Sequence, residues 1–249
     1  MEKLEFFRHL LTALDGQQPA VAVTVIKTAP EVPGVVPGNR YLWTLQGPYG
    51  SPGADNLDAA VAGLAREVLV SRRPRLATLE TAAGRVTLFL EPVLPEPEVI
   101  VLGGGHVGQQ VAAVAKLAGY RVTAIDDRPD FASRALFPLA DRLICNDFTV
   151  ALQEIAITPA TYIVIVTRGH RYDYDCLRAV IEKPAAYIGM IGSRRRIKGV
   201  KERLLADGVP EAVLARVHAP IGLDIGAETP AEIAISILAE IIRVYRQGA

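Results

Sequence analysis

The stretch Val99–Asp126, VIVLGGGHVGQQVAAVAKLAGYRVTAID, decides the fold of the second half of this chain. A short apolar run ends in three glycines, an amphipathic segment follows, and a second apolar run ends in an acidic residue. This order predicts a strand, a tight turn, a helix and a second strand parallel to the first, because a helical crossover joins parallel strands. The spacing of Gly103, Gly105 and Gly108 matches the G-x-G-x-x-G pattern of dinucleotide-binding domains.

The glycines of this loop have distinct mechanical roles. Gly103 permits the tight turn, Gly105 lets backbone N–H groups approach a pyrophosphate, and Gly108 lets the helix lie close to the strand. His106 and Val107 fall at the helix N-terminus, where free N–H groups and the helix dipole favour an anion. We therefore expect these residues to form the cofactor-binding loop, with His106 either touching the ligand or standing only as a tolerated loop residue.

An acidic residue closes the second strand at the expected distance. Asp126 lies 23 residues after Gly103, where a carboxylate typically accepts a hydrogen bond from a ribose hydroxyl. Its charge would repel a ribose 2′-phosphate, although Arg128, two residues further on, weakens that argument. The sequence thus predicts a dinucleotide and leaves the choice between NAD and NADP open.

Strands and helices continue to alternate after Asp126. The expected strands are Arg142–Cys145, Tyr162–Thr167 and Tyr187–Gly192, and the expected helices are Val150–Ala156, Tyr174–Glu182, Arg194–Asp207 and a last one ending at Arg246. Apolar strands separated by helices indicate a parallel sheet covered on both faces. The predicted fold class is α/β, with a Rossmann-like, doubly wound sheet.

The first part of the chain has a different, α+β pattern. The linker Leu94–Glu98 (LPEPE) separates a smaller domain, residues 1–94, from the Rossmann-like domain, residues 98–249, because proline continues neither a helix nor a central strand. In the smaller domain the periodicity predicts helices over Glu2–Leu14 and Asp55–Val70, strands over Ala20–Lys27 and Arg40–Leu45, and a hairpin of Arg75–Thr81 with Arg85–Glu91.

Composition excludes several classes of function. The 249 residues carry 27 basic and 27 acidic side chains, so the basic excess of a nucleic-acid binder is missing. The longest apolar runs are too short to span a bilayer, and the N-terminus lacks the apolar stretch of a signal peptide. Cys145 and Cys176 are not spaced as a metal knuckle or a redox pair. We expect a cytoplasmic protein with no membrane partner, no nucleic-acid partner and no metal site.

The segment Thr167–Asp173, TRGHRYD, follows a strand on the edge where ligands bind in doubly wound sheets. It places Arg168, His170 and Asp173 beside the expected cofactor. His170 and Asp173 are candidates for catalytic acid–base work. Alternatively, Asp173 caps the next helix and His170 only hydrogen-bonds within the loop. The sequence leaves both interpretations open.

Three arginines open the helix after the next strand. Ser193 is a natural N-cap, but Arg194–Arg196 in the first turn oppose the helix dipole. This conflict favours a bound anion such as a phosphate, with a solvated basic face as the alternative. By contrast, Thr229 and Glu232 form a capping box that opens the final helix. The predicted cofactor-binding residues are Gly103, Gly105, His106, Val107, Gly108, Asp126, Arg128, Arg168, His170, Ser193, Arg194 and Arg195.

Four strings, GGGHVG, TRGHRYD, YIGMIGSRRR and RVHAPIGLDIGAETPAEIAISILAEII, occur in this order and together resemble the xanthine dehydrogenase accessory factor (XdhC/CoxI) family. The resemblance spans about 150 residues of the Rossmann-like half. It implies a non-catalytic chaperone that binds the molybdenum cofactor (molybdopterin or its dinucleotide), helps it acquire its terminal sulfur, and delivers it to a molybdenum hydroxylase such as xanthine dehydrogenase.

The first domain departs from the family pattern. The family carries a GSSPR-like string where this chain has Ala29–Gly34 (APEVPG), and a cysteine where this chain has Asn56. An amide can neither act as a thiolate ligand nor carry a persulfide. The sequence therefore predicts a divergent member that holds the cofactor without sulfurating it.

Two rival functions follow from the residues alone. One is an NAD(P)-dependent oxidoreductase, in which His170 or Tyr172 would donate a proton near the nicotinamide. The other is an NAD(H)-sensing regulatory protein. The apolar segment Ile221–Ile225 and the long C-terminal helix also suggest a surface for self-association, as in a homodimer.

Overall fold

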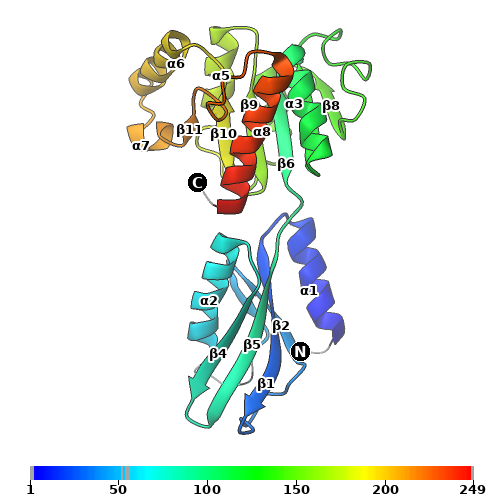
Figure 1. The fold of residues 1–249 in the computed structure, drawn as a ribbon, viewed down its shortest axis with the longest axis vertical. Coiled ribbons are helices and arrows are strands. Elements are labelled where there is room, and N and C mark those ends of the chain that lie inside the picture. Colours follow the sequence, from blue (N-terminus) through cyan, green and yellow to red (C-terminus); the bar gives the residue numbers. More distant parts are fainter. Residues whose placement is uncertain (1–2, 52, 54–56, 248–249) are drawn as a thin grey trace. The chain divides into compact units, whose positions relative to one another are not determined.

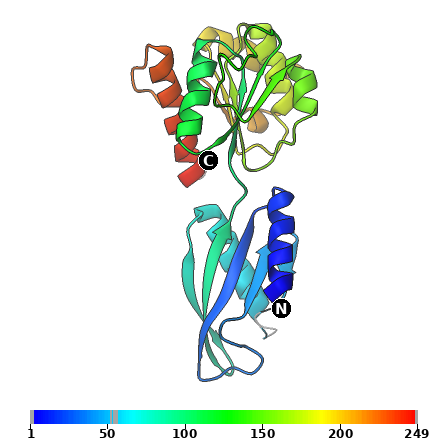
Figure 2. The ribbon, with the colours of Figure 1, turned by 90° about the vertical axis from the view of Figure 1, so that its right-hand side faces the viewer.

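A computed structural model describes residues 3–51, 53 and 57–247 of the chain. The chain divides into two compact units, one ending at Pro95 and the other spanning Glu96–Gln247 (Figures 1 and 2). No helix within the described part is both long and apolar enough to cross a membrane.

The first unit is an antiparallel sheet with two helices. Its strand order is β3-β2-β1-β5-β4. The elements are α1 (Lys3–Asp15), β1 (Ala20–Ala29), β2 (Arg40–Thr44), β3 (Gly47–Tyr49), α2 (Leu57–Ser71), β4 (Arg75–Thr81) and β5 (Gly84–Val93).

The alternation of side chains along β1 explains why a helix covers each face of this sheet. Val21 and Val23 belong to the core cluster that contains the buried residues of α2. Ala20 and Ala22 belong to the second cluster, with Phe6 of α1. Successive residues of a strand point to opposite faces. The central strand β1 is therefore buried on both sides, as its apolar sequence predicts.

The second unit holds a six-stranded parallel sheet in the order β11-β10-β9-β6-β7-β8. Its strands are β6 (Glu98–Leu102), β7 (Arg121–Asp126), β8 (Arg142–Cys145), β9 (Thr161–Ile165), β10 (Tyr187–Met190) and β11 (Val217–His218). Its helices are α3 (His106–Leu117), α4 (Phe148–Gln153), α5 (His170–Val180), α6 (Arg194–Ala206), α7 (Glu211–Leu214) and α8 (Pro230–Gln247).

Helices cover both faces of this parallel sheet (Figure 1). Ile100 and Leu102 of β6 pack in the cluster that includes residues of α4, α5 and α6. Val99 and Val101 pack in the cluster that includes residues of α3 and α8. The predicted α/β, doubly wound, Rossmann-like class is confirmed.

Strand order defines where a ligand would lie. The chain moves outward from β6 through β7 to β8, then returns to β9 on the other side of β6 and continues to β11. The reversal between β6 and β9 is the topological switch point, and ligands of such sheets bind at the carboxyl ends of the strands there. The loops after β6, β7, β9 and β10 therefore border the candidate site.

Several element boundaries differ from those the sequence predicts. Helix α5 begins at His170 rather than Tyr174, with Gly169 in extended conformation as its N-cap. Helix α4 begins at Phe148 rather than Val150, because the Asp147 carboxylate caps it. The short elements β3, α7 and β11 were not expected, since too few residues form them to carry a periodic signal. The predicted capping box of α8 is confirmed: Thr229 Oγ1 accepts from Glu232 N, and a Glu232 carboxylate oxygen accepts from Thr229 N.

A buried carboxylate ties the glycine-rich segment after β11 to the sheet and to α8. Glu240 of α8 accepts hydrogen bonds from Tyr187 Oη at 2.7 Å and from Gly222 N at 2.9 Å. His218 Nδ1 lies 3.3 Å from the same carboxylate. Gly222 has φ +94°, and a Cβ there would lie 2.3 Å from Ser236 Oγ. A turn that only glycine fits and a buried acceptor thus explain this segment structurally.

We expect Glu240→Ala to lower the free energy of unfolding by about 2–4 kcal/mol, because it leaves a buried tyrosine hydroxyl and a backbone N–H without an acceptor. Urea denaturation followed by circular dichroism measures this loss. The exposed Glu228→Ala is the control and should change stability by less than about 0.5 kcal/mol. Equal effects of the two substitutions would contradict this account of the segment.

Candidate functional site

The glycine loop between β6 and α3 is shaped by contacts that only glycine allows. Gly103 has φ +122°, and a Cβ there would lie 2.5 Å from the Val166 carbonyl oxygen. A Cβ on Gly104 would lie 2.5 Å from the Phe131 carbonyl oxygen, and one on Gly108 only 1.9 Å from that of Gly103. These three glycines are therefore required by the fold itself.

Gly105 differs from its neighbours. It is the N-cap of α3 with φ −70° and ψ 179°, a conformation open to any residue, and a Cβ there would meet no atom within 4 Å. No side chain caps α3, so the N–H groups of its first turn face outward without a capping oxygen. Neither backbone strain nor packing requires a glycine here, and glycine is well accepted at an N-cap. In the dinucleotide-binding pattern this position lets a ligand approach the backbone.

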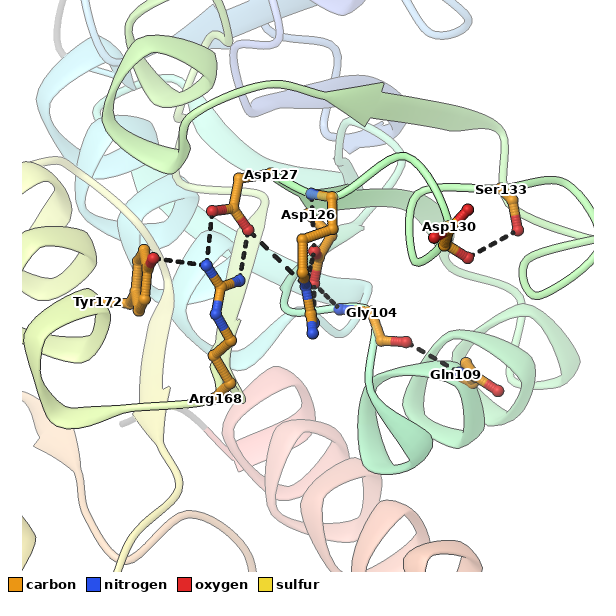
Figure 3. Close-up of polar contacts among 9 residues, drawn as sticks. Gly104, Gln109, Asp126, Asp127, Asp130, Ser133, Arg168 and Tyr172 are labelled. Atoms are coloured by element: carbon orange, nitrogen blue, oxygen red, sulfur yellow. Dashed lines mark hydrogen bonds and ion pairs between the residues drawn. The ribbon is translucent and has the colours of Figure 1, made fainter.

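Asp126 turns inward and fixes the loop (Figure 3). Its carboxylate accepts from Gly104 N at 2.7 Å, from Arg128 N at 3.0 Å, and from Arg128 Nε and Nη2 at 2.9 and 3.1 Å. A carboxylate offers about four acceptor positions. All are used here, and Asp126 is only 1% exposed. A ribose contact through Asp126 would require one of these bonds to open.

An ion pair crosses the switch point. Asp127, directly after β7, accepts from both Nη atoms of Arg168, which follows β9 (Figure 3). Arg168 also donates to Tyr172 Oη and lies 4.1 Å from the centre of that ring. The guanidinium holds the pKa of Asp127 below its usual range, and the carboxylate raises the pKa of Arg168. Because β6 lies between β7 and β9, this pair joins the two sides of the edge that carries the glycine loop.

A second carboxylate is buried below the loop after β9. Asp173 is fully buried, accepts from Thr167 Oγ1 at 2.6 Å, and pairs with Arg196 of α6. Arg196 also donates to the Thr167 carbonyl at 3.3 Å. Asp173 thus lies in the first turn of α5 and does not cap the helix. The expected loop over residues 167–173 is shorter than predicted, because α5 already begins at His170. With no exposed surface, Asp173 has no geometry for the catalytic role that its sequence position suggested.

A pocket of about 660 Å³ opens between α5 and α6, next to these residues. It is lined by Arg168, Gly169, Tyr174, Ser193, Arg195, Arg196, Gly199, Val200 and Arg203. Ser193 is the N-cap of α6, as predicted, and accepts from Arg196 N. The lining contains four guanidinium groups and no carboxylate. It is therefore suited to an anion.

The structure brings most of the predicted binding residues to this edge, with exceptions. Arg168, Ser193 and Arg195 line the same pocket. Arg194 lines a different hollow, of about 340 Å³, with Lys198 and Lys201. His106 lines a third, of about 290 Å³, with the start of α8. The side chain of His170 and the whole of Asn56 lie outside what the structure describes, so their predicted roles stay predictions.

The pocket residues that sequence reasoning missed include Tyr174, Gly199 and Arg203. One signal was present, because a glycine in the middle of the basic helical segment RRRIKGVKERLLA is unfavourable for a helix. The other two carry no signal of their own, since only the packing of α5 against α6 places them together.

Two substitutions distinguish the glycines that the fold requires from Gly105, which the fold does not require. We expect Gly108→Ala to lower the free energy of unfolding of the Rossmann unit by about 2 kcal/mol, because its Cβ overlaps a carbonyl oxygen. Gly105→Ala should stay within about 0.5 kcal/mol of the unmodified chain. Urea titrations of the two variants provide the comparison, and a similar loss in both would refute the distinction.

The two cysteines should differ in their reactivity. Cys145 is exposed, whereas Cys176 lies on the buried face of α5, and burial raises the pKa of its thiol well above the usual range. The Cys176 thiol therefore stays protonated and shielded near neutral pH. Titration with a disulfide reagent should detect one thiol in the native protein and two after denaturation. Rapid reaction of both native thiols would contradict the burial of Cys176.

The family model described as the XdhC Rossmann domain matches residues 99–241. The uncharacterized protein YqeB of Escherichia coli (strain K12) is 32% identical over 207 residues, which is 78% of this chain and 38% of YqeB. A probable xanthine dehydrogenase subunit of Bacillus subtilis (strain 168) is 33% identical over 162 residues, which is 65% of this chain and 47% of that protein. The matches thus span less than half of each relative's length.

The crystal structure of a xanthine dehydrogenase from Bacillus halodurans has a similar fold. It superposes with a TM-score of 0.56 over 97% of this chain and 96% of that one, at 21% sequence identity. Since the family model covers more than half of the 249 residues and coincides with the parallel-sheet unit that carries the glycine loop, this chain belongs to the XdhC family.

Proposed function

We propose that this chain is an accessory factor of molybdenum hydroxylase maturation, which holds the molybdenum cofactor, or its dinucleotide, on the Rossmann unit and passes it to a client enzyme of the xanthine dehydrogenase kind. Membership of the XdhC family supports the assignment. The observation that carries it is Gly105, a glycine that neither the backbone nor the packing requires, at the uncapped start of α3.

The residues present fit the phosphate groups of such a cofactor. The open first turn of α3 offers backbone N–H donors to a pyrophosphate. On the other side of the switch point, Arg195 and the N-terminus of α6 offer positive charge to a second anionic group. In the client enzyme the cofactor supplies the molybdenum that carries out hydroxylation, whereas the residues of this chain bind, orient and shield it.

The ion pair of Asp127 with Arg168 would limit how tightly the chain holds the cofactor. It crosses the edge where the ligand would lie, and a phosphate can replace the Asp127 carboxylate as the partner of Arg168. Exchange of one anion for another keeps the guanidinium paired in both states. Because the cofactor has to displace the Asp127 carboxylate, its affinity for the chain stays moderate. A protein that later releases its cofactor to a client enzyme needs such moderate affinity.

The cysteines of the chain bear on sulfur transfer. Asn56 stands where the resemblance places the family cysteine; Cys176 is buried in the core, and the exposed Cys145 lies in the other unit, at the end of β8. The proposal is therefore limited to holding and delivery, without sulfuration of the cofactor. Restoring the thiol, by Asn56→Cys, should leave cofactor affinity unchanged, since the change lies outside the Rossmann unit.

Native mass spectrometry of the full chain with molybdopterin dinucleotide, NAD or NADP tests the proposal. We expect selective uptake of the molybdopterin dinucleotide, and a loss of at least about tenfold in its affinity in Gly105→Val, because the valine side chain occupies the space before the α3 N-terminus. Gly63→Val, at a glycine of α2 with equally open surroundings, is the matched control and should bind normally.

Two outcomes would overturn the proposal. Selective, tight binding of NAD or NADP with no uptake of the molybdopterin dinucleotide would make the chain an oxidoreductase or a nucleotide sensor. Unchanged affinity in Gly105→Val would show that the phosphates bind elsewhere.

A further inference from the structure

The pocket between α5 and α6 has features that phosphate binding at the α3 N-terminus does not explain. It extends from the carboxyl ends of β9 and β10 along the two helices, reaching Tyr174 on α5 and Arg203 on α6. Its volume of about 660 Å³ lies in the range of small-molecule and cofactor sites. A single phosphate would fill only its mouth.

One wall of the pocket is formed by an arginine that lies over a tyrosine ring. The Arg203 guanidinium lies 3.6 Å from the centre of the Tyr174 ring, and the Tyr174 hydroxyl donates a hydrogen bond to Asp207 at the end of α6. The ring is thus anchored at its hydroxyl, and the guanidinium carbon lies over the ring. Guanidinium planes stack well on planar, delocalised rings.

The mouth of the pocket carries unneutralised charge. Arg196 is paired with buried Asp173, and Arg168 with Asp127. Arg195, by contrast, is exposed and has no carboxylate partner among the residues that the structure describes. Helix α6 bears six basic residues and one acidic residue, in a chain whose formal net charge is zero. An anionic group would meet Arg195 at the start of this helix.

A glycine keeps the middle of the pocket open. Gly199 lies in the sixth position of α6, where glycine costs roughly 0.5–1 kcal/mol relative to alanine. A Cβ there would meet no atom within 4 Å, and the residue lines the pocket. As at Gly105, the fold does not require the glycine, and a side chain would project into the space between the Arg195 mouth and the Arg203 wall.

We propose that this pocket binds the planar heterocycle of the ligand together with its anionic substituent: the ring stacks on the Arg203 guanidinium, and a phosphate or carboxylate lies at Arg195. This deepens the proposed function and rests on it for the attachment of this group to a pyrophosphate on the glycine loop. Arg168 lines the pocket and pairs with Asp127 across the switch point, so the two halves of one dinucleotide-type ligand would meet there. A pterin that carries a carboxylate or phosphate and a reduced nicotinamide nucleotide both combine a flat, uncharged heterocycle with an anionic substituent.

Isothermal titration of the full chain with pterin-6-carboxylate, reduced nicotinamide mononucleotide (whose ring is uncharged) and inorganic phosphate tests the proposal. We expect saturable binding of at least one ring probe, weakened at least about tenfold in Gly199→Leu. Gly63→Leu, in the middle of α2, controls for a bulky residue at an open helix glycine. The preferred ring probe identifies the source of the heterocycle as a pterin or a nicotinamide.

A charge-conserving variant tests the stacking role separately. Arg203→Lys keeps the positive charge and removes the flat guanidinium, so ring affinity should fall several-fold while phosphate affinity stays unchanged. Arg195→Ala should weaken all three probes, because each carries an anionic group. Thermal melting of every variant confirms that the fold is intact.

Three results would overturn the inference: no saturable binding of either ring probe, unchanged ring affinity in Gly199→Leu, or equal losses for ring probes and phosphate in Arg203→Lys. Failure here is distinguishable from failure of the proposed function. If Gly105→Val lowers the uptake of molybdopterin dinucleotide and Gly199→Leu does not, the cofactor-holding role remains and only the placement of the ring is wrong.

Discussion

The close approach of α3 to the end of β6 is the constraint on which the Rossmann unit depends. Gly108 passes so near the Gly103 carbonyl oxygen that a methyl group would lie 1.9 Å from it. This approach places the first turn of α3 directly over the carboxyl end of the central strand. Helix α8 packs beside α3 on the same face, and its residue Glu240 in turn anchors the segment after β11. Because Gly108 has no side chain, α3 can lie against the end of β6, and α8 packs beside it. The N-terminus of α3 thereby faces the edge of the sheet where ligands bind.

Buried carboxylates determine which arginines remain available at this edge. Asp126 is saturated by Gly104 and Arg128, and Asp173 is saturated in a similar way by Thr167 and Arg196. These acids act as internal anchors for the loops after β6 and β9. Because the cost of burying a charge is offset only by close pairing, their partners are fixed by the fold and are poorly placed to serve a ligand.

The remaining cations and the two unexplained glycines lie where a dinucleotide-type ligand would lie. Gly105 opens the approach to the α3 N-terminus, and Gly199 opens the pocket between α5 and α6. Arg195 has no carboxylate partner among the described residues, and Arg168 is shared between the pocket and Asp127. At Gly199, inside a helix, stability alone would favour a side chain, since glycine loses more conformational freedom on folding than any other residue. The proposed ligand would occupy the space that the absent side chains leave at both positions.

The sequence by itself determined the parallel α/β architecture, the turn after β6, the N-caps Ser193 and Thr229, and the family, because periodicity, turn chemistry and capping act over a few neighbouring residues. The tertiary structure alone decided that Asp126 faces inward, that Asp173 is buried, and that Arg194 and Arg195 line different hollows. Residues 23 and 41 positions apart form the ion pairs of Arg196 with Asp173 and of Arg168 with Asp127. Strand order brings such partners together, and no local pattern in the sequence encodes it.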